Sequence, residues 1–166
     1  MNFGEVVKTR RSIRVYQDKD VSDELIGTII SAAMAAPSAG NQQPWQFIVT
    51  RDRDKLEAIP DFHPYCKMVP KAPVAIVVCG DPVGKKWPDF WVQDCSAAIQ
   101  NLLLAARAEG RATVWTGVYP VEERVKGCRE LFFIPEQVIP LAIIPVGWPG
   151  REEDFKEIDR FNQKLV

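Results

Sequence analysis

The sequence predicts a single domain of the α/β class, in which helices and strands alternate along the chain. Three segments carry this prediction: an amphipathic helix over residues 21–36, a strand over residues 74–79, and the longest helix over residues 90–109. A chain of 166 residues is long enough for one sizeable core and too short for two ordinary domains. We therefore expect residues 1–166 to form one domain.

Two helices are expected near the N-terminus. Asn2 is a suitable N-cap for a short helix over residues 2–9, and Ser22 is a suitable N-cap for the clearer helix over residues 21–36. The second helix ends before Pro37, whose ring removes a backbone N–H. Its apolar side chains recur at helical spacing and are expected to face the core: Leu25, Ile26, Ile29, Ile30 and Ala33.

The middle of the chain predicts strands on either side of an irregular stretch. Residues 45–50 are expected to form a strand, followed by a short helix over residues 55–59. Residues 60–73 contain repeated prolines, which exclude long regular elements. The β-branched run over residues 74–79 is typical of a strand buried on both faces.

The second half contains the longest helix, over residues 90–109, with Gly110 as its C-terminal stop. A strand over residues 112–115, a short helix over residues 121–128 and a strand over residues 138–146 follow. The long helix is apolar around much of its circumference, which indicates cover on more than one side, from its own domain or from a partner subunit.

The last segment, residues 151–166, is charged and carries aromatic and aliphatic side chains at helical intervals, namely Phe155, Ile158 and Phe161. The residues alone leave open whether it is a flexible tail or an arm that packs elsewhere.

Composition excludes several classes of protein. The formal net charge of −1 and the lack of a second basic patch disfavour a nucleic-acid-binding module. No apolar run reaches the length of a membrane span and no secretory signal is visible, so we expect a soluble, cytoplasmic protein. The four cysteines show no metal-binding or disulfide spacing, and we expect buried, reduced thiols and no metal site. His63, the single histidine, offers weak support for a hydrolase.

Positive charge is concentrated near the N-terminus. Four cationic side chains and one hydroxyl fall within seven positions: Lys8, Arg10, Arg11, Ser12 and Arg14. A solvated surface run is the common outcome for such a cluster. The alternative is an anion site, because guanidinium groups and a hydroxyl suit a phosphate well. Position in the sequence does not decide between the two.

Residues 35–47 combine small residues, amide and hydroxyl groups and a Trp between a helix and a strand. Loops held by rigid elements are where binding groups concentrate, so this segment is the main candidate for a site. Two nucleotide motifs are excluded. Residues 80–86 lack the spacing and the Ser or Thr of a P-loop, and no Gly-x-Gly-x-x-Gly sequence follows a predicted strand.

Three separated segments share the order and spacing of one family's motifs. They read Arg10-Arg11-Ser12-Ile13-Arg14, then Pro37-Ser38-Ala39-Gly40-Asn41-Gln42-Gln43-Pro44-Trp45, then Trp115-Thr116-Gly117. Together they resemble the FMN-dependent nitroreductase family, and the resemblance runs from Phe3 to Arg160-Phe161-Asn162. The chain resembles a short, compact member, because typical members carry additional helical segments.

The resemblance implies a central mixed, mainly antiparallel sheet flanked by helices, assembled as an intertwined homodimer with FMN at the subunit interface. It places Arg10, Arg11, Ser12 and Arg14 at the flavin of their own subunit, with Arg10 and Ser12 toward the phosphate and Arg14 beside the pyrimidine edge. Arg160 would complete the phosphate site. Thr116 and Gly117 would lie beside the flavin ring. The partner subunit would supply Pro37, Ser38, Ala39 and Asn41, and residues 151–166 would form an arm on the partner.

The implied activity is transfer of a hydride from NADH or NADPH through FMN to a small acceptor, such as a nitroaromatic or a quinone, in a ping-pong reaction. No side chain would be an obligatory catalyst, because the flavin carries the chemistry. The alternative function is a protein on the same scaffold that binds or senses flavin without significant turnover.

Overall fold

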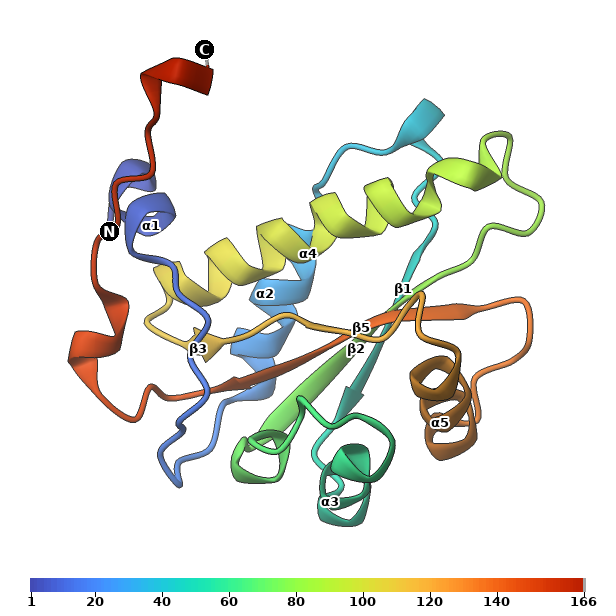
Figure 1. Cartoon of the computed structure of the whole chain (residues 1–166), viewed down its shortest axis with the longest axis horizontal. Helices are drawn as coiled ribbons and strands as arrows, with labels where there is room; N and C mark the ends of the chain where they lie inside the picture. Colours follow the sequence, from blue (N-terminus) through green and yellow to red (C-terminus); the bar gives the residue numbers. More distant parts are fainter. Residues whose placement is uncertain (166) are drawn as a thin grey trace.

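A five-stranded sheet runs through the middle of the molecule, with helices on both faces (Figure 1). This computed structural model describes residues 1–165. The order along the sheet is β1 (Trp45–Thr50), β2 (Val74–Gly80), β5 (Ile139–Gly147) and β3 (Ala112–Thr113), while β4 (Thr116–Gly117) also pairs with β5. The pairs between these strands are antiparallel, and a bridge between Ser12 and Thr113 adds a parallel contact. The expected mixed, mainly antiparallel sheet is confirmed.

Strand β2 is buried along its whole length because both faces of the sheet are covered. Val74, Ile76 and Val78 belong to the core on one face. The alternate residues Ala75, Val77 and Cys79 belong to a second core on the opposite face. Successive side chains of a strand point to opposite faces, so the unbroken apolar run supplies both cores.

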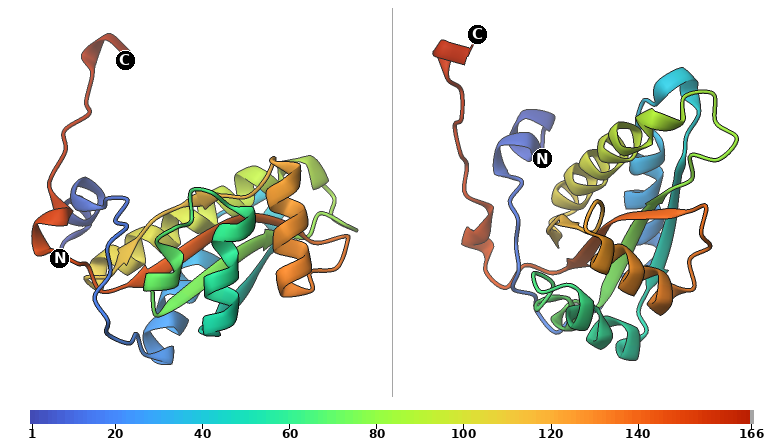
Figure 2. Two further views of the ribbon diagram at one scale, coloured as in Figure 1. Left: turned by 60° about the horizontal axis from the view of Figure 1, so that its bottom comes forward. Right: turned by 45° about the vertical axis from the view of Figure 1, so that its right-hand side comes forward.

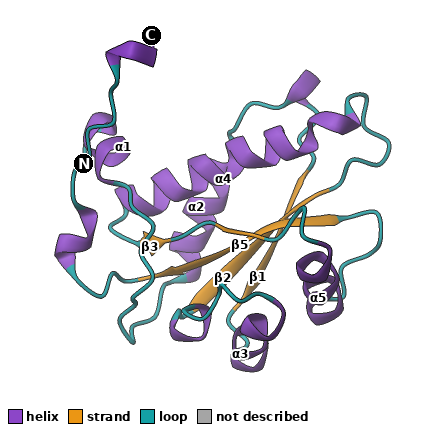
Figure 3. Cartoon of the chain, in the orientation of Figure 1, coloured by secondary structure: helices purple, strands orange, loops and turns teal. Residues whose placement is uncertain are grey.

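One face is covered by α2 (Asp23–Met34) and α4 (Trp91–Ala108), as Figure 3 shows. Ser22 caps α2 as predicted, accepting a hydrogen bond from the N–H of Leu25. Gly110 follows α4 with a φ of +70°, a left-handed conformation that glycine adopts without strain. Its N–H donates to the carbonyl of Arg107, which closes the helix.

The opposite face is covered by α3 (Arg53–Phe62) and α5 (Glu122–Phe132). The prediction for α3 was too short, because the helix continues through Pro60. Asp52 caps its start, and the N–H of His63 donates to the carbonyl of Ile59, which closes the turn that contains Pro60. Burial of Leu56 and Ile59 outweighs the one hydrogen bond that a proline removes.

Residues 112–117 form two short strands, because β3 and β4 pair with separated parts of β5. The expected single strand over residues 112–115 was wrong in this respect. The other elements are a helix and five 3₁₀ turns: α1 (Phe3–Thr9), η1 (Ala39–Asn41), η2 (Val69–Lys71), η3 (Pro88–Phe90), η4 (Glu152–Phe155) and η5 (Gln163–Leu165).

The C-terminal segment passes beside α1 and then leaves the body of the molecule (Figure 2). The N–H of Ile158 donates to the carbonyl of Lys8, and Lys8 pairs with Glu157 at 3.2 Å. The guanidinium of Arg107 lies 3.9 Å from the ring centroid of Phe155. Beyond these contacts, Phe161 and Leu165 are 76% and 83% exposed.

Candidate functional site

The segment that follows α1 is extended and fixed to the edge of the sheet. Ile13 donates its N–H to the carbonyl of Thr113 at 3.0 Å, and its side chain is buried. Side chains alternate along an extended chain, so Ser12 and Arg14 point away from the core while Ile13 points into it. The exposure of Ser12 and Arg14 agrees with this arrangement.

A cavity of about 550 Å³ lies where this segment meets the C-terminal segment. We call it the arginine cavity. Cations dominate its lining, which consists of Arg10, Arg11, Ser12, Arg151, Asp154, Lys156, Ile158 and Arg160. The structure therefore brings together the three residues predicted to bind the phosphate, Arg10, Ser12 and Arg160, and with them Arg11, which was predicted to face the flavin.

Cationic side chains outnumber carboxylates in this cavity, because Asp154 is the one acid among the lining residues given above. No ion pair among the described residues involves Arg10, Arg11 or Arg160. Burial, and then the nearby charges of Arg11 and Arg160, lower the pKa of Arg10. Nε of Arg11 is buried without a hydrogen-bond partner in the part of the chain that the structure describes. An anion with several acceptor oxygens would offset the positive charge that lowers the pKa of Arg10 and would offer hydrogen-bond acceptors to the guanidinium groups.

A second cavity, of about 500 Å³, includes Arg14 in its lining. We call it the Gly117 cavity. Its lining is aromatic and cationic: Arg14, His63, Pro64, Tyr65, Lys67, Met68, Trp115, Thr116, Gly117 and Arg124. Thr116 contributes little hydrogen-bonding capacity there, because its hydroxyl donates to the carbonyl of Ile143 at 2.5 Å and lies 3.2 Å from Sγ of Cys66.

The Cα of Gly117 faces a part of this cavity that no other atom of the protein fills. A Cβ placed on Gly117 would meet no atom within 4 Å, and its backbone is outside the left-handed region. Gly147 differs, because a Cβ there would lie 2.8 Å from Tyr16 and 3.0 Å from Pro73. The fold thus requires glycine at 147 but not at 117. The open space at Gly117 fits a flat ring packed closely against the backbone.

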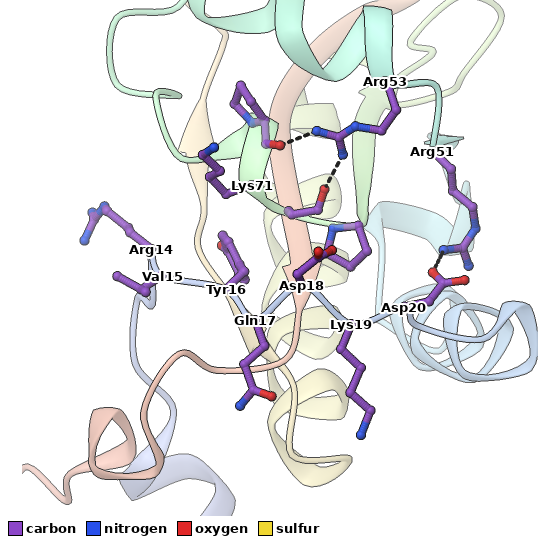
Figure 4. A pocket seen from close by; sticks show the side chains of 13 residues that line it. Arg14, Val15, Tyr16, Gln17, Asp18, Lys19, Asp20, Arg51, Arg53 and Lys71 are labelled. Carbon is purple, nitrogen blue, oxygen red and sulfur yellow. Dashed lines mark hydrogen bonds and ion pairs between the residues drawn. The ribbon is translucent and has the colours of Figure 1, made fainter.

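A third cavity, of about 800 Å³, is a groove that shares Arg14 with the Gly117 cavity (Figure 4). Its other arginines are occupied within the fold. Arg51 binds Asp20 and Asp23, at 3.0 and 2.8 Å, and Arg53 donates to the carbonyls of Pro70 and Ala72. Arg51 and Arg53 therefore stabilise the fold, and their presence in the groove does not indicate an anion site.

The segment Pro37–Asn41 lines neither the arginine cavity nor the Gly117 cavity. The N–H of Ala39 and the amide of Gln42 bind the carboxylate of Asp94, which stands in the first turn of α4. Arg107, in the last turn of the same helix, donates to Oγ1 of Thr9 beside the arginine cavity. At about 1.5 Å per residue, the stretch of α4 from Asp94 to Arg107 separates these contacts by roughly 20 Å.

One chain therefore does not bring all predicted site residues together. Pro37, Ser38, Ala39 and Asn41 lie at the N-terminal end of α4. Arg10, Arg11, Ser12 and Arg160 line the arginine cavity near its C-terminal end, and Arg14, Thr116 and Gly117 line the Gly117 cavity. Within the loop, Gly40 and Asn41 have φ values of 56° and 54°, as predicted for residues that tolerate unusual backbone angles. The hydroxyl of Ser38 accepts from the N–H of Gln43.

The lining residues that the sequence analysis missed include three basic side chains: His63, Lys67 and Arg124. His63 and Lys67 come from the proline-rich stretch, and Arg124 comes from α5. None stands in a motif, so only the packing of α3 and α5 reveals them. Among the described residues no cluster of metal ligands occurs, and no helix is long and apolar enough to cross a bilayer.

The comparisons with known proteins define the family. The model of the nitroreductase family matches residues 7–65 and 61–148. A relative from Methanothermobacter thermautotrophicus, provisionally named NADH dehydrogenase/NAD(P)H nitroreductase, is 56% identical over 95% of this chain and 83% of its own. The chain belongs to the nitroreductase family.

Solved structures agree. A protein of the same provisional name from Parabacteroides distasonis superposes with a TM-score of 0.92 and 39% identity, covering 99% of this chain and 95% of its own. A protein from Desulfovibrio desulfuricans, provisionally named a nitroreductase and solved in complex with FMN, superposes with a TM-score of 0.84 and 31% identity, covering 99% of this chain and 94% of its own. The predicted family, fold and oxidoreductase class are confirmed.

Proposed function

We propose that the protein is an FMN-dependent oxidoreductase that acts as a homodimer. The observation that carries the proposal is the position of Ser12 to Arg14, which join a cavity rich in cationic side chains to a cavity with open space at Gly117. A flavin mononucleotide has a dianionic phosphate at one end and a flat ring at the other. The two cavities match these two ends.

The arginine cavity would hold the phosphate. Arg10 and Arg160 supply charge-assisted donors, and Ser12 supplies a hydroxyl. Arg11 adds positive charge to the cavity, while its Nη1 and Nη2 donate to the carbonyls of Arg10 and Lys8. Binding of an anion would also reduce the repulsion between Arg10, Arg11 and Arg160.

The Gly117 cavity would hold the ring. Gly117 permits close approach, and Arg14 places a positive charge in the lining of the same cavity, where it would stabilise negative charge on the pyrimidine edge. FMN bound there would supply the redox chemistry, taking a hydride from NADH or NADPH and passing it in a second half-reaction to a small acceptor such as a nitroaromatic or a quinone.

The protein's own thiols are poor nucleophiles. All four cysteines are buried, and burial raises the pKa of Cys66, which lies behind Thr116, to about 11. Cys66 is therefore protonated at neutral pH. This supports a reaction in which the side chains bind and orient while no residue acts as an obligatory catalyst.

A homodimer would complete the site. An apolar groove of about 420 Å³ runs between α1, α2 and α4, lined by residues that include Phe3, Ala32, Leu104 and Ala108. A second copy packed on this face would cover it and would carry its own Pro37, Ser38, Ala39 and Asn41 to the first subunit's flavin. The exposed Phe161 and Leu165 support the proposal that residues 151–166 pack as an arm on the partner.

An absorption spectrum tests the function. Protein reconstituted with FMN should be yellow, and its visible bands should bleach when NADH or NADPH is added without oxygen. Return of the colour on adding a quinone or a nitroaromatic would support the two half-reactions. Colour that never bleaches would favour the flavin-binding or sensing alternative. Failure to bind FMN at all would overturn the proposal.

A further inference from the structure

The carbonyl of Gly117 receives hydrogen bonds from two helices. Nε2 of His63 lies 2.8 Å from this oxygen, and Nη1 of Arg124 lies 3.0 Å from it. His63 directly follows α3, and Arg124 belongs to the first turn of α5. The two helices on one face of the sheet therefore meet at a single peptide of the cavity wall.

The proton position on His63 follows from its partners. A carbonyl oxygen only accepts hydrogen bonds, so Nε2 carries the proton. The ring is 1% exposed, and Nδ1 is buried without a partner in the described part of the chain. A second proton on Nδ1 would bury an unpaired charge, so His63 is held as a neutral donor.

The residue before Gly117 is anchored as well. The hydroxyl of Thr116 bonds to the carbonyl of Ile143 and lies beside Sγ of Cys66. Both residues of β4 are thus held from the core side, while the Cα of Gly117 faces open space. Arg124 is itself supported, because its guanidinium lies 5.2 Å from the ring centroid of Tyr65.

Position 117 has two opposing requirements, open space for a ring and a fixed backbone, and these contacts satisfy the second. A glycine leaves room for a ring, but its backbone is also the freest to rotate. A carbonyl tied to two donors cannot turn without breaking both bonds. The pair of donors restores the rigidity that the missing side chain removes.

We propose that His63 and Arg124 are positioning residues that hold the Gly117 peptide in the one orientation that fits the flavin ring. The inference rests on the proposed function. It assigns to the two side chains a role in cofactor affinity and reduction potential, beyond joining α3 and α5 to the sheet. Neither side chain needs to touch the cofactor for this role.

The test measures FMN affinity, the reduction potential of the bound FMN and the melting temperature of the apo-protein in four variants. Arg124→Met and His63→Leu each remove one donor, and each should weaken FMN binding about tenfold, the effect of losing one such bond, and shift the potential. His63→Gln keeps an N–H donor near the position of Nε2 and should restore affinity and potential toward wild type.

Arg129→Met is the matched control. Arg129 also stands on α5 and donates to a backbone carbonyl, that of Pro135, outside the Gly117 cavity. This variant should keep FMN affinity and potential whatever it does to the melting temperature. If His63→Leu does not fold, Arg124→Met carries the test, because Arg124 is only half-buried.

Wild-type affinity and potential in Arg124→Met would overturn the positioning role and leave the proposed function standing. A potential shifted equally by Arg129→Met would also overturn it, since the effect would then come from α5 as a whole. A wild-type protein that takes up no FMN would overturn the proposed function and the positioning role together.

Discussion

The backbone N–H of Ala39 donates a 2.9 Å hydrogen bond to Oδ1 of Asp94, a carboxylate that is only 5% exposed in the first turn of α4. The other carboxylate oxygen of Asp94 accepts a hydrogen bond from the side-chain amide of Gln42 at 2.9 Å. Gln42 is fixed in turn, because it donates to the carbonyl of Trp87 and accepts from the N–H of Trp87. One buried acid thus sets the position of the Pro37–Asn41 loop.

The exchange Asp94→Asn should loosen this loop. The new amide places a donor against Ala39 or Gln42, and the bonds to Trp87 prevent Gln42 from turning over. We expect a loss of about 1–3 kcal/mol in the free energy of unfolding, measured in urea, and weaker FMN binding by the dimer. Asp89→Asn, on an exposed residue, is the control. If Asp94→Asn is measurably destabilised but binds FMN with unchanged affinity, the Pro37–Asn41 loop is not part of the FMN site.

Gly117→Ala tests the open space in the Gly117 cavity. The added methyl meets no protein atom and no backbone strain, so the apo-protein should keep its stability or gain up to about 1 kcal/mol. FMN affinity should fall tenfold or more, because the methyl occupies the space meant for the ring. Gly147→Ala should instead lower the stability of the apo-protein, because the added methyl would clash with Tyr16. A Gly117→Ala protein with wild-type FMN affinity would show that the ring does not approach this backbone.

The sequence predicted the elements whose apolar pattern is strong. The burial of β2 on both faces, the cap of α2 by Ser22 and the end of α4 at Gly110 all follow from local rules. The extent of α3 did not, because only its packing against α5 explains how a helix continues through Pro60.

The candidate site divides in the same way. Arg10, Ser12 and Gly117 could be proposed because each stands in a motif of contiguous residues. His63 and Arg124 could not, since their importance depends on one carbonyl that lies 54 and 7 residues away in the chain. A lone histidine in a proline-rich stretch carries no signal of such a contact.

Arg10→Ala tests the arginine cavity. The variant removes a charge-assisted donor to the phosphate, so FMN affinity should fall about tenfold to a hundredfold. The apo-protein should not lose stability in proportion, because Arg10 is crowded by Arg11 and Arg160. Riboflavin, which has no phosphate, is the control ligand and should bind Arg10→Ala and wild type alike. An equal loss for both ligands would place Arg10 elsewhere than at the phosphate.

Stability should depend on pH through His63. Burial lowers the pKa of His63 in the folded protein, whereas the unfolded chain keeps the ordinary value of 6.5. Between these two values the unfolded chain binds more protons, so the free energy of unfolding should fall as the pH drops below about 6.5 and level off below the folded pKa. The fall should be continuous across that window and reversible.

Urea denaturation of wild type and His63→Gln from about pH 7.5 down to about pH 5 measures this dependence. Gln keeps an N–H donor for the Gly117 carbonyl but does not titrate, so its curve should lack the part of the slope that comes from His63. Arg124 and the ring of Tyr65 face His63 in both proteins, which keeps their contributions matched. Parallel curves would mean that His63 accepts its second proton in the folded protein as readily as in the unfolded chain, and that Nδ1 finds a partner there.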